Sequence, residues 1–505
     1  MRHSSRRTFL GRSVHAAAGV AAADLAFLSS LDPVRAQETK VDPQAVQFRS
    51  EIEPLVRFLE DTPRGKLLEG VAAKIRSGTT YREVLTALLL AGVRNVQPRP
   101  SVGFKFHAVL VVNSAHLASL SSPDRDRWLP IFWALDYFKS SQARDVREGN
   151  WTMPPVDESR IPSADKAPGS FRQAMDSWDV AAVDTAVTGL ARTRGAAELF
   201  EQFALYGARD FRSIGHKAIF VANSWRALQC IGWQHAEPVL RSLAYALLNH
   251  RGEPNPSKSD LAADLPWRTN QQRAKKIRKG WLQGKLDPIA TTKLLTTLRS
   301  GSSDDACDMT VELLNTGVSP QSIYDALFLG SSELLVRQSG IVALHASTTT
   351  NAMHYAFRMV GNDRTRKLLL LQNVAFLPLF RDAMGPRGEV REANVMELQA
   401  ATETVSATED VFASVQRNND EAAQKSLAWL SNGGNPKQFI DDARRLVFLK
   451  GTDSHDYKYS SAVLEDCYSV SPEFRNRYLA ASVFKLRGSN ERDNGLVKRI
   501  QSALT

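Results

Sequence analysis

The chain has 505 residues, of which 43% are hydrophobic and 23% charged, a composition typical of a globular protein with a sizeable core. This length allows two or more domains, or one large helical array. The net charge of +10 is spread along the chain apart from the basic run 273–279, which we interpret as a solvated helix face, so no nucleic-acid partner is expected. Cys230, Cys307 and Cys467 are too few and too far apart for a disulfide framework, a zinc ribbon or a c-type haem motif.

The N-terminus matches an export signal. Arg6 and Arg7 stand in the motif Ser-Arg-Arg-Thr-Phe-Leu of twin-arginine substrates, and an alanine-rich stretch and a small-residue cleavage site follow. Residues 1–36 are therefore predicted to be a signal peptide, with the twin-arginine translocase as partner and a periplasmic or extracellular destination. Asp24 interrupts the apolar stretch, and no later segment reaches spanning length, so no stable membrane span is expected in the mature chain.

Helical periodicity dominates the first third of the mature chain. Apolar residues recur three and four positions apart from Glu51 to Val96, and again over Phe104–Leu120 and the aromatic-rich segment Arg127–Phe138. The stretch from Glu148 to Ser170 is different, because four prolines and sparse apolar spacing forbid a long helix. Such a long loop is usually a lid, a binding loop or disordered, and we favour a covering loop.

The rest of the chain repeats a helix–break–helix rhythm. Helices are expected at Val180–Tyr206, His216–Cys230, His235–Asn249, Pro288–Leu298, Ala306–Leu314, Pro320–Phe328, Ser339–Val360, Arg364–Phe380, Ala400–Gln416 and Asn419–Leu430. Because strand-like alternation is almost absent, the prediction is an all-α fold of paired helices packed as a solenoid or toroid around a central buried site. A turn at 385–388 separates a main metal-site domain, 37–388, from a C-terminal helical part, 389–505, that packs on it.

Histidines begin four apolar helix-like runs, at His107, His216, His235 and His345. An imidazole within an apolar helix costs free energy unless a partner or a metal satisfies it. Helical positions nine apart differ by about 180°, so only one of each pair, His107 and His116 or His345 and His354, can face a shared site. His455 and Lys458 are three apart and can share a helix face. We predict one buried metal site built from His107, His216, His235 and His345, with His455 or Lys458 completing it.

The neighbouring polar and aromatic residues allow two interpretations each. Asn113, Asn223 and Asn351 can orient imidazoles or bond helix to helix, and Thr349 flanks His345 on its helix face. Trp225 and Tyr245, like Trp233 and Tyr355, are pocket walls or core residues. A buried Lys458 either forms a salt bridge or loses its proton, and the neutral amine can then take up carbon dioxide and become a carboxylate-like ligand. Imidazoles without thiolates suit iron, zinc, copper or nickel.

Three motifs resemble those of the questin oxidase-like family. They are His216-Lys-Ala-Ile-Phe220, His345-Ala-Ser-Thr348 and Asp453-Ser-His455-Asp-Tyr-Lys458, although Phe220 stands where the family has a second histidine. The resemblance implies a non-haem iron held by histidines and a lysine-derived carboxylate. It also implies oxygenation of an aromatic polyketide or quinone, with dioxygen and a small organic substrate as partners.

Other functions fit the same residues. The histidines can be packing residues of a non-catalytic helical-repeat binding protein, or the ligands of a zinc hydrolase. No His-Glu-x-x-His helix is present to support the latter. An exported, iron-dependent oxygenase is the leading hypothesis, and the metal content of the purified protein separates the three.

Overall fold

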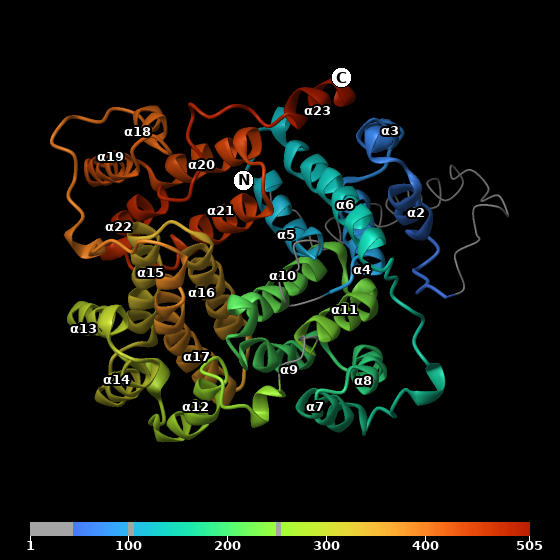
Figure 1. Ribbon diagram of the computed structural model, residues 1–505, viewed down its shortest axis with the longest axis horizontal. Helices are drawn as coiled ribbons and strands as arrows, with labels where there is room; N and C mark the ends of the chain where they lie inside the picture. The colour runs from blue at the N-terminus through green and yellow to red at the C-terminus, as the bar shows by residue number, and fades with distance from the viewer. Residues whose placement is uncertain (1–43, 99–105, 249–253) are drawn as a thin grey trace, which may run out of the picture. The chain divides into compact units, whose positions relative to one another are not determined.

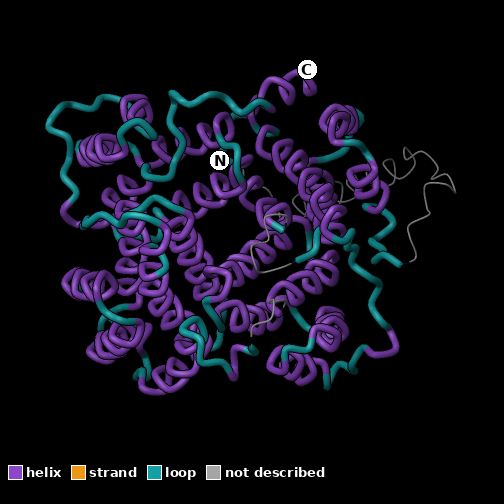
Figure 2. Tube along the Cα trace, in the orientation of Figure 1, coloured by secondary structure: helices purple, strands orange, loops and turns teal. Residues whose placement is uncertain are grey.

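A computed structural model describes residues 44–98, 106–248 and 254–505. The chain divides into two compact units, Met1–Ala45 and Val46–Thr505, and every helix described below lies in the second. Its described part contains 22 α-helices and no strand, only an isolated parallel bridge between Lys285 and Val318 (Figure 2). The all-α prediction is confirmed, whereas the solenoid or toroid arrangement stays a prediction. The predicted signal peptide, with Arg6 and Arg7, lies outside the described residues.

The helices of the N-terminal half are mostly two to four turns long. They are α2 (Glu53–Asp61), α3 (Arg64–Arg76), α4 (Tyr81–Asn95), α5 (His107–Leu120), α6 (Leu129–Glu148), α7 (Ala167–Ser177), α8 (Val180–Thr193), α9 (Ala196–Ala208), α10 (His216–Ile231), α11 (Ala236–Leu248) and α12 (Leu265–Lys276). Two short 3₁₀ helices, η3 (Arg212–Gly215) and η4 (Trp233–His235), lead into α10 and α11.

The C-terminal half continues with eleven more. They are α13 (Pro288–Ser300), α14 (Ser303–Thr316), α15 (Pro320–Arg337), α16 (Ile341–Met359), α17 (Asp363–Asp382), α18 (Thr408–Ser414), α19 (Asn419–Ser431), α20 (Pro436–Lys450), α21 (Ser454–Asp466), α22 (Pro472–Ser482) and α23 (Leu496–Leu504). Many begin at a side-chain cap, and the capping box of Asp453 and Asp456 that starts α21 is one example.

The helix boundaries agree only in part with the sequence prediction. The helical units predicted over Val180–Tyr206 are α8 and α9, which are separated because Arg194 is extended and Gly195 is the N-cap of the second helix. Of the helix predicted at Ala400–Gln416, only α18 forms. The proline-rich segment between α6 and α7 contains no α-helix, as predicted, and only one short 3₁₀ turn.

Four helices from distant parts of the chain pack in a closed cycle (Figure 1). α5 packs against α10, α10 against α16, α16 against α21, and α21 against α5. The residues after 388 thus supply one side of the same core as the residues before them. This cycle places the starts of four helices close together. No helix in the described part of the chain is both long enough and apolar enough to span a membrane.

Candidate metal centre

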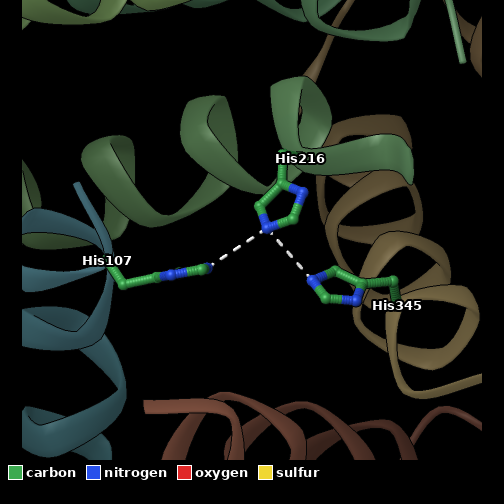
Figure 3. Close-up of side chains that lie close together, drawn as sticks. All are labelled: His107, His216 and His345. Atoms are coloured by element: carbon green, nitrogen blue, oxygen red, sulfur yellow. Dashed lines mark hydrogen bonds between the residues drawn. The ribbon is translucent and has the colours of Figure 1, made fainter. Parts of the chain in front are cut away.

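Three buried histidines meet where the four helices of the cycle begin. His107 is the first residue of α5, His216 the first of α10, and His345 lies in the second turn of α16. Figure 3 shows His216 between the other two imidazoles, with its Nε2 directed toward both. The remote parts of the chain therefore converge at one interior point, as predicted, and this histidine cluster can hold a metal ion.

The spacing of the ring nitrogens suits a shared metal. His216 Nε2 lies 3.0 Å from His345 Nε2 and 3.2 Å from His107 Nε2. One nitrogen from each of the three rings lies within 4.8 Å of the others. Nitrogens that bind one metal at about 2.1 Å lie roughly 3.0 to 3.4 Å apart at octahedral and tetrahedral angles. The two short separations fall in that range.

Hydrogen bonds to the backbone fix the tautomers of two rings. His216 Nδ1 lies 2.6 Å from the carbonyl oxygen of Ser213, and His345 Nδ1 lies 2.7 Å from that of Ile341. A carbonyl oxygen only accepts, so each Nδ1 carries the proton and donates. In the neutral rings both Nε2 atoms therefore carry lone pairs, and these two atoms are the ones that approach to 3.0 Å. This contact is not a hydrogen bond between neutral imidazoles, because neither atom has a proton to give.

Burial keeps the rings neutral. The pKa of each of His107, His216 and His345 is lowered well below its usual value, first because burial penalises the charged form and then because other cationic groups lie nearby. A proton shared between His216 and His345 would require one buried imidazolium. The cluster thus offers several lone pairs toward one point and disfavours the protonation that would otherwise relieve their repulsion.

An unusual turn delivers His216 to the cluster. Ser213, Ile214 and Gly215 all have left-handed backbone angles, with φ of 57°, 47° and 76°. Only glycine adopts this region without cost, so the first two residues are strained. Gly215 also packs tightly, since a Cβ atom there would lie 2.1 Å from Thr349 Oγ1. The turn aims the Ser213 carbonyl at His216 Nδ1, and Thr349 acts by packing on this turn.

Two buried ion pairs hold the same turn in place. Arg212 binds Asp264 through two hydrogen bonds of 3.0 and 2.6 Å, and Lys217 Nζ donates to Asp210 at 2.9 Å. All four side chains are essentially inaccessible to solvent. Burial lowers the pKa of Lys217 to about 8, although Asp210 counteracts this effect. We call these four residues the ion network; it fixes the residues on both sides of His216.

Helix α21 brings a fourth imidazole and an amine. Lys458 Nζ lies 2.8 Å from His107 Nε2 and is buried, which lowers its pKa to about 7. The His455 ring packs against His107 and His345, with centroid distances of 4.8 and 5.3 Å. Its Nδ1 donates to Asp453, so the Nε2 of the neutral ring carries the lone pair. The predicted proximity of His455 and Lys458 to the other histidines is therefore found.

Asp453 is the anion of this region. Burial alone would raise its pKa, but the hydrogen bonds from the His455 side chain and backbone, together with the positive charge of Lys458, lower it to about 2. The residue is also the N-cap of α21. Its role follows a common pattern in which a carboxylate orients a metal-binding histidine. In the sequence, Asp453 stands out only as the first residue of the third family-like motif, and the prediction of site residues does not include it.

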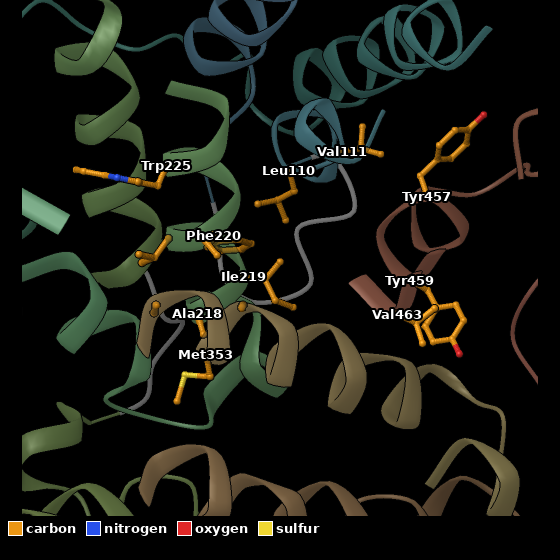
Figure 4. Close-up of a cluster of buried hydrophobic side chains, with 14 of the residues drawn as sticks. Leu110, Val111, Ala218, Ile219, Phe220, Trp225, Met353, Tyr457, Tyr459 and Val463 are labelled. Atoms are coloured by element: carbon orange, nitrogen blue, oxygen red, sulfur yellow. The ribbon is translucent and has the colours of Figure 1, made fainter. Parts of the chain in front are cut away.

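The same four helices also carry buried apolar side chains (Figure 4). They include Leu110, Val111, Ile219, Phe220, Met353, Tyr457 and Val463. Phe220, which replaces the family's second histidine, packs with its ring 5.8 Å from the His216 ring. The burial of the three imidazoles limits the access of water to their nitrogens and strengthens electrostatic interactions between them.

Three other histidines lie elsewhere. As the nine-residue spacing predicts, His116 and His354 face away from the cluster, the first bonded to Tyr81 and the second packed on the rings of Tyr324 and Phe328. The prediction that His235 belongs to the cluster is wrong. It ends η4, and the charged groups near it are those of Arg49, Glu51 and Arg82. Its run of apolar residues belongs to α11, which begins one residue later and packs on α8 and α10.

The remaining predicted neighbours serve mainly in packing. Asn223 donates to the Leu110 carbonyl oxygen and Asn351 donates to Glu465 and Asp466, so both join helices, while Asn113 is buried in α5. Trp225 packs between Phe200 and Trp233. Tyr245 lies in a separate cavity near α8. The groups that orient His216 and His345 are the backbone carbonyls of Ser213 and Ile341, which side-chain patterns do not reveal.

Comparisons with protein-family models, with curated proteins and with solved structures found no match to this chain.

Proposed function

We propose that the histidine cluster binds a single non-haem iron ion and that the protein is an oxygenase acting on an aromatic or quinone-like substrate. The observation that carries the metal site is the approach of two lone-pair-bearing nitrogens, His216 Nε2 and His345 Nε2, to 3.0 Å inside the protein. Two such atoms repel each other unless an electrophile lies between them, and protonation is disfavoured by burial. A metal ion supplies that electrophile.

The ligand set is compatible with iron. His107, His216 and His345 contribute neutral nitrogens, with His455 as a fourth, and no cysteine is among the residues of the cluster. Nitrogen and oxygen donors suit ferrous iron and zinc alike, so the resemblance to questin oxidase-like proteins decides for iron. When bound, iron would supply a position at which dioxygen can be activated beside an organic molecule. The chain's own part is to hold the imidazoles rigidly and to exclude water.

Lys458 completes the site in this proposal as a carbamate. A metal cation would meet four helix N-termini, each partly positive, and an amine 2.8 Å from His107 Nε2. Attack of the neutral amine on carbon dioxide forms an N–C bond and releases one proton, which converts this group into an anionic oxygen ligand. The resulting negative charge would offset the cation and the helix ends.

The carbamate can be tested without measuring turnover. Lys458→Ala should bind metal weakly, and a short carboxylate such as acetate or propionate should restore binding by filling the space of the lost side chain. Lys458→Met, which retains most of the volume, should bind weakly with or without the added acid. Tight metal binding by both variants would remove Lys458 from the ligand set.

Metal analysis tests the function. The purified mature protein should contain about one equivalent of iron and consume dioxygen in the presence of a hydroxylated quinone or polyphenol. His216→Ala and His345→Ala should lack both properties. Zinc, with hydrolysis of ester substrates and no oxygen consumption, would establish the zinc hydrolase instead. A stable protein that binds neither metal would leave the histidines as packing residues of a binding protein.

Export by the twin-arginine route is the second part of the proposal. It rests on Arg6, Arg7 and the following alanine-rich stretch. Because this route carries folded proteins, the metal could be inserted before export. Replacement of both arginines by lysine should retain the precursor in the cytoplasm, and the exported protein should begin near residue 37. Export unaffected by the replacement would exclude this route.

A further inference from the structure

A cavity lies beside the proline-rich loop. Its volume is about 290 Å³, and it is lined by this loop, the first half of α8 and the middle of α11. Trp151 and Pro154 from the loop, Val183 from α8 and Tyr245 from α11 form much of its wall. None of its lining residues belongs to the histidine cluster. The covering role predicted for this loop thus applies to a cavity of its own.

The apolar walls suit a flat ring. The Trp151 and Tyr245 rings lie 6.2 Å apart, centroid to centroid, at an interplanar angle of 37°. Pro154 and Pro155 add two rigid apolar rings on the loop side. The volume lies near the lower end of the range for small-molecule sites and would hold a one- or two-ring compound. Filled with water alone, it would hold roughly ten molecules, each facing mainly apolar surface.

One guanidinium provides the polar end of the cavity. Arg241 is 2% exposed; its Nε and Nη2 donate to the Asp184 carboxylate at 2.8 and 2.9 Å, and Nη2 also donates to the Pro154 carbonyl oxygen at 2.8 Å. Its Nη1 is buried without a hydrogen-bond partner among the described residues. Arg241 therefore ties the loop to both helices and still has an unused donor.

The adjacent hydroxyl is also unused. Ser242 lines the same cavity, is 2% exposed, and its Oγ has no hydrogen-bond partner in the described part of the chain. Buried polar groups are nearly always paired, because an unpaired one loses its hydrogen bonds to water and gains none in return. Two unused donors, one cationic, beside aromatic walls indicate a ligand that brings acceptors.

We propose that this cavity binds a small aromatic carboxylate. Its ring would lie against Trp151, Tyr245 and the prolines, and its two oxygens would accept from Arg241 Nη1 and Ser242 Oγ. A carboxylate matches two donors because it has only acceptors to offer. Arg160, from the loop, adds a second positive charge to the lining. The proposal is independent of the metal site and would stand if that site proved to be structural.

Binding of 2-naphthoate and of its neutral amide tests this site. Calorimetry on the mature protein should show binding of the acid and at least tenfold weaker binding of the amide. Ser242→Ala should weaken binding of the acid about three- to tenfold, as expected for one lost hydrogen bond. Arg241→Lys should weaken it further, and thermal unfolding should verify that the variant is folded.

Ser426→Ala is the matched control. Ser426 is a buried helical serine of α19 whose hydroxyl donates to the Ala422 carbonyl oxygen, and it does not line the cavity. Its replacement should leave the affinity for 2-naphthoate unchanged. Absence of binding, equal affinity for acid and amide, or equal affinity of wild type and Ser242→Ala would each overturn the proposal and leave a water-filled cavity.

Discussion

Two groups of buried polar residues, the ion network and the histidine cluster, lie close together at His216. They differ in how their hydrogen-bond donors and acceptors are paired. In the ion network, Arg212 faces Asp264 and Lys217 faces Asp210, so each cation has a carboxylate as its counter-ion. In the histidine cluster, nitrogen lone pairs face one another, and the group beside them is the Lys458 side-chain nitrogen. Both groups are buried.

The difference separates a structural role from a binding role. A network in which each buried cation has its counter-ion stabilises the fold without a further ligand, whereas converging acceptors without protons require one. Burial of polar residues alone therefore does not identify the metal site. The balance of donors and acceptors identifies it, because the ion network is paired by charge whereas the histidine cluster presents acceptors without donors.

Breaking the ion network should produce the largest loss of stability. Asp264→Asn removes the charge that faces Arg212 and should lower the free energy of unfolding by about 3–5 kcal/mol, because a buried guanidinium is left without its counter-ion. Chemical denaturation with and without metal measures this effect, and the loss should be similar in both conditions. The control Asp260→Asn, which removes the exposed partner of Arg268, should change little. A loss that appears only with metal bound would contradict the assignment.

Removing a histidine of the cluster should lower metal affinity and leave the stability of the metal-free protein largely unchanged. His345→Gln should lower metal affinity at least about 100-fold, or roughly 2.7 kcal/mol, while the metal-free protein keeps most of its stability because a repulsive contact is lost. Titration with ferrous iron under nitrogen and thermal unfolding of the metal-free form measure the two quantities. His116→Gln, outside the cluster, should bind metal normally. Strong destabilisation of the metal-free protein by His345→Gln would indicate a packing role.

The turn before His216 links the two groups. Gly215→Ala places a Cβ against Thr349 on a left-handed backbone and should displace His216, lowering metal affinity about 10- to 100-fold. Gly169→Ala in α7, where a Cβ meets nothing within 4 Å, is the matched control and should have no effect. Unchanged affinity in Gly215→Ala would show that this turn does not position the ligand.

His354, a buried histidine outside the cluster, should make the stability of the protein depend on pH. Burial lowers the pKa of His354 to about 3, so its ring stays neutral in the folded protein and gains a proton on unfolding below about pH 6.5. Its contribution to stability is complete above that pH and is lost as the pH falls toward 3. Between pH 6.5 and 4.5 the wild type should therefore lose about 1.4 kcal/mol more of its free energy of unfolding per pH unit than His354→Gln does. Parallel pH profiles for the two proteins would contradict the burial of a neutral ring.

Much of this arrangement is predictable from sequence because helices have a fixed period. Apolar spacing indicates the all-α fold, and the nine-residue spacing correctly predicts that only one histidine of each pair faces the cluster. His235 shows the limit of this reasoning. It too begins an apolar run, but which helix starts meet depends on tertiary packing between residues hundreds of positions apart.

Other features lie beyond side-chain patterns. The carbonyls of Ser213 and Ile341 set the tautomers, and backbone groups carry no sequence signature. The left-handed turn at Ser213 and Ile214 contains none of the asparagines or glycines that normally indicate one, apart from Gly215. The sequence around Asp453 indicates a helix cap, and the structure confirms it. Its second role, to orient His455, is evident only from the position of that ring.

X-ray absorption at the metal edge of the protein loaded with ferrous iron tests the central claim most directly. We predict one ion per chain that survives desalting, with at least three imidazole nitrogens at about 2.0–2.2 Å and no sulfur ligand. An ion lost on desalting, or a spectrum in which water oxygens account for the first coordination sphere, would contradict a metal site formed by His107, His216 and His345.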